Sequence, residues 1–171
     1  MILGMSISTF TWAHVVLSLV GMFSGAVVLF GMLRSAWLNG WTLLFLITTF
    51  LTSVTGFFFP FGAFGASHIV GVISLMLLAA AISAKYSFQL AGAWRWIYVI
   101  GAVTALYLNV FVGIVQAFRK WPFLISLAPT QSEPPFIAAQ SLVLAAFVAL
   151  GVVSARRFHP ETKAAALNPS L

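Results

Sequence analysis

The sequence predicts an all-α protein, a polytopic integral membrane bundle of five transmembrane helices. Of the 171 residues, 62% are hydrophobic and 6% are charged, whereas a soluble domain carries about 25% charged residues. The apolar residues gather in five stretches. Each approaches or exceeds the about 20 residues that a helix needs to cross a bilayer core of about 30 Å. None of them alternates apolar with polar residues, as the strands of a membrane β-barrel do.

Each of the five stretches stops at a basic residue or a proline. The stretches cover about residues 12–33, 38–59, 66–84, 94–118 and 136–155, and the residues that directly follow them are Arg34, Pro60, Lys85, Arg119 and Arg156. We therefore expect a single transmembrane domain over residues 1–157. The remaining residues, 158–171, contain two prolines and no hydrophobic periodicity, which predicts a flexible cytoplasmic tail.

The basic residues predict the orientation of the chain. Five crossings put the two termini on opposite sides of the membrane. The side of the C-terminus then holds Arg34, Lys85, Arg95, Arg156, Arg157 and Lys163, and the other side holds Arg119 and Lys120. Because cytoplasmic loops are rich in Lys and Arg, we expect an outer N-terminus and a cytoplasmic C-terminus. The expected location is a bacterial cytoplasmic (inner) membrane, where the chain is a multi-pass protein in contact with the lipid bilayer.

The composition excludes several classes of function. The chain has no cysteine, so disulfides, thiolate metal sites, iron–sulfur clusters and covalent c-type haem are excluded. It also has no aspartate, no phosphate-binding glycine loop and no motif of a zinc protease. The net charge of +6 comes from single or paired basic residues at the ends of the stretches. This spacing does not follow a phosphate backbone, so no nucleic-acid partner is expected.

His14 and His68 are the strongest candidates for a functional site. Each lies about one turn inside the start of an apolar stretch, and five crossings bring both to the outer face. A polar residue at this depth favours a partner or a water-filled pocket, and a neutral imidazole binds haem iron, copper or zinc. If their helices are neighbours, the two histidines predict a shared site for haem b or a metal. The alternative is two interfacial residues with solvated tips.

Other polar residues on the outer side are expected to complete this site. Arg119 and Lys120 can bind anionic groups of the bound molecule, such as haem propionates. Gln116 and Gln140 are expected to line the cavity, or else to form hydrogen bonds between helices. Glu133 is the candidate third ligand of a metal site formed with the two histidines. Its alternative role is a cap for the fifth helix, because carboxylates are favoured near helix N-termini.

Small and hydroxyl-bearing residues inside the helices predict close packing. Gly21 and Gly25 form a small-xxx-small pair in the first helix, and Asn109 lies near the middle of the fourth. The second helix carries a run of hydroxyl residues over 48–55. Such residues allow close backbone approach and form hydrogen bonds between helices.

The two outer loops are apolar and carry a single charged side chain, that of Glu133. The first covers residues 57–64 and contains five phenylalanines. The second covers residues 121–135, where four prolines prevent a continuous helix. Interfacial anchoring explains such loops, and so does contact with another membrane subunit or a second copy of the chain.

Two resemblances accompany these predictions. The segments 105–111, ALYLNVF, and 127–136, LAPTQSEPPF, resemble a family of small bacterial inner-membrane proteins that has no established activity. In architecture alone, the chain is similar to the small di-histidine b-type membrane cytochromes. It departs from them because it offers one histidine pair. Electron transfer across the membrane through two haems is therefore in doubt.

The preferred hypothesis is a haem- or quinone-associated redox or accessory protein with its site at the outer face. One alternative is a non-enzymatic structural or assembly subunit of a membrane complex. A third is a carrier of a small solute or a lipid, although the chain has no charged coupling residues inside its helices. No residue is assigned a catalytic role.

Overall fold

The computed structural model describes residues 1–59 and 66–160, and all its regular elements are helices. These elements are α1 (Ile7–Leu33), α2 (Asn39–Gly56), α3 (Ala66–Ile82), the π-helical turn η1 (Ser83–Ser87), α4 (Trp94–Lys120), α5 (Pro122–Leu127) and α6 (Pro134–Arg157). The described residues contain no β-strand, and their only extended pairing is a bridge between Ile2 and Met5. The prediction of an all-α protein is confirmed.

Four helices are long and apolar enough to cross a membrane. They are α1, α4, α6 and the segment His68–Ser87, which joins most of α3 to η1. This finding supports a multi-pass membrane protein with four such helices in the described ranges, rather than the expected five. The exception is α2, which has 18 residues and is about 27 Å long at about 1.5 Å per residue. Asn39, Gly40 and its hydroxyl residues lower its hydropathy.

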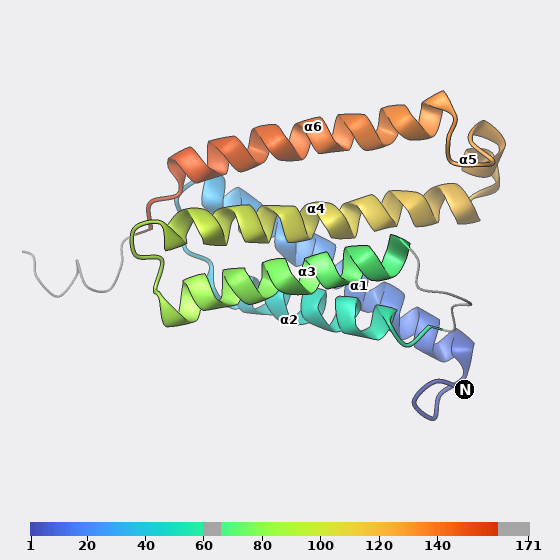
Figure 1. Cartoon of the computed structure of the whole chain (residues 1–171), viewed down its shortest axis with the longest axis horizontal. Helices are drawn as coiled ribbons and strands as arrows, with labels where there is room; N and C mark the ends of the chain where they lie inside the picture. The colour runs from blue at the N-terminus through green and yellow to red at the C-terminus, as the bar shows by residue number, and fades with distance from the viewer. Residues whose placement is uncertain (60–65, 161–171) are drawn as a thin grey trace, which may run out of the picture.

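The long helices α1, α2, α3, α4 and α6 lie along one common axis, and each runs opposite to the one before it (Figure 1). α1 packs on α2, α2 on α3, α3 on α4 and α4 on α1, while α6 lies against α4 and α1. In this ring, α1 and α3 occupy diagonal positions. The hypothesis of a shared histidine site depended on α1 and α3 being neighbours, but α2 and α4 lie between them, because each contacts both.

Local sequence signals set where several helices begin. α1 begins five residues before the apolar stretch, because the Ser6 hydroxyl caps it by accepting a hydrogen bond from the Thr9 N–H at 3.1 Å. Such an N-cap satisfies one of the donors that the first turn leaves unpaired. Pro122 and Pro134 occupy the first positions of α5 and α6, where proline is favoured because its fixed φ suits a helix start. The proline-rich loop over residues 121–135 therefore contains one short helix.

Close contact between α1, α2 and α4 occurs at Gly25. A methyl group placed there would lie 2.6 Å from Leu106 Cδ1 and 2.8 Å from the Phe45 ring. Both of these side chains are almost fully buried. Only a residue without a side chain allows the three helices to approach this closely.

The end of the bundle near the C-terminus is closed by aromatic residues. Phe158 is 1% exposed, stacks on Trp37 with the ring centroids 5.7 Å apart, and packs on Tyr98. Arg95 donates hydrogen bonds to the carbonyl groups of Ala155 and Phe158 at the end of α6. Phe158 is therefore part of the bundle, and the expected tail of residues 158–171 does not begin there. Residues 161–171 lie outside the described ranges.

Replacing Gly25 by alanine is expected to destabilise the bundle, while the same change at Gly40 is not. Overpacking a tight core costs about 1–3 kcal/mol, whereas Gly40 has open space around its Cα. The free energy of unfolding in detergent, measured for Gly25→Ala and Gly40→Ala, checks this. Equal stability of the two variants would contradict the packing described here.

Candidate functional site

His14 lies on α1 and faces the C-terminal end of α2. Its Nδ1 atom is 2.8 Å from the Thr55 hydroxyl, and its ring meets that of Phe59 edge-on with the centroids 5.1 Å apart. The Thr55 hydroxyl also donates to the Leu51 carbonyl at 2.7 Å. In the tautomer with its proton on Nδ1, His14 donates to the Thr55 oxygen, and the other ring nitrogen, Nε2, carries the lone pair that binds a metal or accepts a hydrogen bond.

His68 lies on α3 at the same end of the bundle. Its ring packs on Phe57 with the centroids 5.7 Å apart. Phe57 also fills the space beside Gly71, where an added methyl group would come within 2.9 Å of the ring. The glycine three residues after His68 therefore makes room for a phenylalanine.

The structure brings the two histidines to one end of the bundle, where the contacts described here are with different side chains. His14 contacts Thr55 and Phe59, and His68 contacts Phe57. Both histidines therefore contact the segment 55–59, which comprises the last two residues of α2 and the turn that follows it. A haem held by two histidines needs them on either side of one open slot. Here α2 contacts both α1 and α3, and the aromatic side chains at its end pack on the two imidazole rings.

The remaining predicted site residues do not converge on one cavity. Arg119 and Lys120 are exposed at the end of α4, and Gln116 is exposed one turn before them. Gln140 donates to the Phe111 carbonyl at 3.2 Å, which links α6 to α4. Its Oε1 atom is buried without a hydrogen-bond partner among the described residues. The pairing of Gln116 with Gln140 in a shared cavity is not seen.

Glu133 occupies the N-cap position of α6, as expected, but its carboxylate bonds backwards to the loop. It accepts hydrogen bonds from the Thr130 N–H at 3.1 Å, from the Thr130 hydroxyl at 2.8 Å and from the Ser132 N–H at 3.1 Å. Pro134 and Pro135, the first two residues of the helix, have no N–H to offer. Desolvation raises the pKa of Glu133, but these hydrogen bonds outweigh it and hold the pKa below its ordinary value.

The described residues do not form a metal site of three protein ligands. Within the ranges 1–59 and 66–160, no three His, Asp or Glu side chains lie close enough to hold one ion. His14, His68 and Glu133 are therefore not gathered as the three-ligand hypothesis requires. Glu133 instead stabilises the loop before α6.

Polar residues inside the bundle form hydrogen bonds from one helix to another. The Asn109 amide donates to the Thr49 hydroxyl at 3.2 Å, beside Gly21. The Ser53 hydroxyl donates to Ser74 at 3.0 Å. These pairs link α4 to α2 and α2 to α3, so the prediction of interhelix hydrogen bonding holds for Asn109.

Lys85 is a residue whose environment the sequence analysis did not anticipate. It lies in η1, is 7% exposed, and its ammonium group is 5.0 Å from the centre of the Trp37 ring and 4.8 Å from that of Tyr86. Aromatic faces attract cations at such distances. The only signal in the sequence was the adjacent Tyr86, because Trp37 is distant along the chain.

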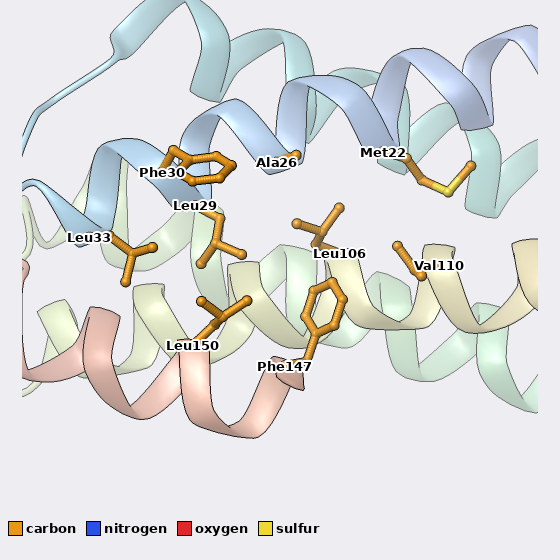
Figure 2. Close-up of a pocket in the computed structure, with 9 residues that line it drawn as sticks. All are labelled: Met22, Ala26, Leu29, Phe30, Leu33, Leu106, Val110, Phe147 and Leu150. Carbon is orange, nitrogen blue, oxygen red and sulfur yellow. The ribbon is translucent and has the colours of Figure 1, made fainter. Parts of the chain in front are cut away.

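An apolar groove of about 230 Å³ lies between α1, α4 and α6 (Figure 2). Met22, Ala26 and Leu33 of α1 face Leu106 of α4 and Leu150 of α6 across it. The groove lies among the apolar side chains of the bundle, apart from the two histidines. No spacing of residues in the sequence indicated it.

No protein-family profile, curated protein or solved structure matches this chain.

Proposed function

We propose that the chain crosses the membrane five times, with α2 as the additional crossing. α2 lies alongside the four apolar helices (Figure 1) and packs on both α1 and α3. Several of its hydroxyl residues form hydrogen bonds within the bundle, which is compatible with this position, although the buried Thr52 hydroxyl has no partner among the described residues. Thr48, for example, is buried and donates to the Leu44 carbonyl at 2.7 Å. A helix that turns its polar side chains inward shows lipid a less polar surface than its composition suggests.

Five crossings in alternating directions place the N-terminus and the loops before α3 and α6 on one side. Six basic residues then belong to the side of the C-terminus and two, Arg119 and Lys120, to the side of the N-terminus. This excess supports an outer N-terminus and a cytoplasmic C-terminus in a bacterial cytoplasmic membrane.

Reporter fusions test this topology. Fusions that end after residues 36, 64, 90, 130 and 160 are expected to report cytoplasmic, outer, cytoplasmic, outer and cytoplasmic positions in that order. A reporter that is active only in the cytoplasm and a second that is active only outside give complementary readings. If the fusions at 36 and 64 report the same side, α2 does not cross and the proposal fails.

In function, the chain is proposed as a non-enzymatic structural or accessory subunit of a membrane complex. The observation that carries this proposal is the use of the interior polar groups. Asn109, Ser53 and Gln140 bond to groups on neighbouring helices, so they serve helix packing. The groove in the described region has apolar walls and offers no polar group for chemistry.

The outer end of α2 is the proposed contact surface. Phe57 and Phe58 are exposed, and neither the residues around them nor the loop that follows carries a charge. Uncharged aromatic surface at the membrane boundary suits contact with another apolar subunit. Phe61 and Phe64, which belong to the same predicted loop, lie outside the described residues.

A photo-crosslinking amino acid at position 58 tests this surface in intact membranes. It is expected to give a discrete protein adduct, because Phe58 is proposed to face a partner subunit. The matched control is the same amino acid at Leu142, which is 73% exposed on α6 and is expected to contact lipid. If position 58 gives no protein adduct, or both positions give the same set, the accessory-subunit proposal is contradicted.

A haem- or quinone-associated redox protein is the second candidate. It is supported by the common location of His14 and His68 at the outer end of α2, and by the Thr55 contact that leaves Nε2 of His14 for a ligand. Arg119 and Lys120, at the matching end of α4, would face the anionic groups of a haem. For both histidines to bind one iron, the phenylalanines that pack on their rings would have to move.

The absorption spectrum of protein purified from haem-replete cells separates the two candidates. The accessory-subunit proposal predicts no Soret band. A band that disappears in both His14→Ala and His68→Ala, and persists in His159→Ala, would establish the haem candidate instead. A loss in only one of the first two variants would exclude a bis-histidine site.

A further inference from the structure

The apolar groove between α1, α4 and α6 has the dimensions of a hydrocarbon chain in one leaflet. Along α1 its lining runs from Met22 to Leu33, a rise of about 16 Å at about 1.5 Å per residue. This is close to half of a bilayer core of about 30 Å. Its volume of about 230 Å³ exceeds that of cavities of about 150 Å³ that bind benzene. A transmembrane helix of a partner would need a groove that runs the full thickness.

The groove begins at the end of the bundle where exposed arginines gather. Leu33, at one limit of the groove, is followed by Arg34, and α6 ends with Arg156 and Arg157. All three arginines are exposed. The ends of α1 and α6 lie together, because the N–H of His159 donates to the hydroxyl of Ser35 at 2.9 Å. Three exposed cations therefore lie at the end of the bundle where the groove begins.

These cations have no carboxylate to balance them in the described part of the chain. Glu133, its one acidic residue, lies at the opposite end of the bundle. The two other cations at the arginine end have different partners. Arg95 donates to carbonyl groups of α6, and Lys85 packs against aromatic rings. Among the described residues, the three exposed arginines thus have no carboxylate partner and are available to an anion at the level of the lipid headgroups, while Glu161 lies outside the described ranges.

We propose that this groove binds one anionic phospholipid, with an acyl chain between α1 and α6 and its phosphate at Arg34, Arg156 and Arg157. The inference rests on the proposed membrane topology, which sets the arginine end in the cytoplasmic leaflet. A guanidinium group binds phosphate through paired hydrogen bonds. The groove adds apolar contact with the acyl chain, which a flat basic surface does not provide. A second copy of this chain would bring three more arginines to the same place, which disfavours a dimer there.

Native mass spectrometry of protein released from nanodiscs tests the proposal. The nanodiscs contain phosphatidylglycerol and phosphatidylcholine in equal amounts, and the readout is the ratio of the two lipids retained on the protein. We expect retention of a single phosphatidylglycerol. The triple variant Arg34→Gln, Arg156→Gln, Arg157→Gln should reduce the ratio at least about fivefold, because each basic residue near an anionic lipid surface contributes roughly that factor.

A second variant separates a seated lipid from general attraction to negative charge. Ala26→Phe fills the middle of the groove and keeps the arginines, so it should also lower retention of phosphatidylglycerol. Its control is Ala145→Phe, at an exposed alanine of α6 that is not part of the groove lining. The charge control is Arg119→Gln with Lys120→Gln at the opposite end. Both controls should retain lipid as the parent protein does.

Several results would overturn the proposal. If Ala26→Phe retains as much phosphatidylglycerol as the parent protein, the lipid is not seated in the groove. If the control at Arg119 and Lys120 loses the lipid as the triple variant does, the protein attracts anionic lipid through its overall positive charge. A retained second copy of the chain in place of lipid would mean a dimer interface. An absence of lipid preference, with the reporter fusions still reading five crossings, would reject the lipid site and leave the topology intact.

Discussion

The structure depends on the close approach of three helices near the middle of the bundle. At Gly25, α1 lies against Phe45 of α2 and Leu106 of α4, with no room for a methyl group. One turn away, Asn109 of α4 bonds to Thr49 of α2. Helices in lipid gain little from the hydrophobic effect when they associate, so small residues and interhelix hydrogen bonds supply much of the attraction. Once α1, α2 and α4 are joined in this way, α3 packs between α2 and α4, and α6 packs between α1 and α4.

This arrangement decides what the histidines can do. With α1 and α3 on a diagonal, His14 and His68 each contact residues at the end of α2. Phe57 and Phe59 pack on the two imidazoles there, and Thr55 meets the Nδ1 atom of His14. The histidines thus have partners that an apolar environment requires of polar groups. These contacts hold this end of the bundle together, because they join α1 and α3 to the residues at the end of α2.

The two ends of the bundle differ in chemistry. The end that holds the N-terminus combines aromatic side chains with the loop that Glu133 stabilises. The opposite end combines buried aromatic residues with cations, of which Arg95 and Lys85 are bound within the bundle. The exposed arginines and the groove beside them are the basis of the proposed site for an anionic lipid. The uncharged aromatic end is the basis of the proposed contact with a protein partner.

The sequence by itself determined the class of protein, the approximate limits of the long helices and the residues that separate them. These features are local, because apolar run length and the positions of proline and basic residues act through the nearest turns of the chain. It also indicated that Asn109 and the glycines of the first helix would be used in packing. The order of helices around the bundle, the diagonal placement of the histidines, the burial of Phe158 and Lys85, and the groove were decided by the tertiary structure. Each of these depends on side chains that are distant along the chain and meet only when the helices pack, so no spacing within one segment encodes them.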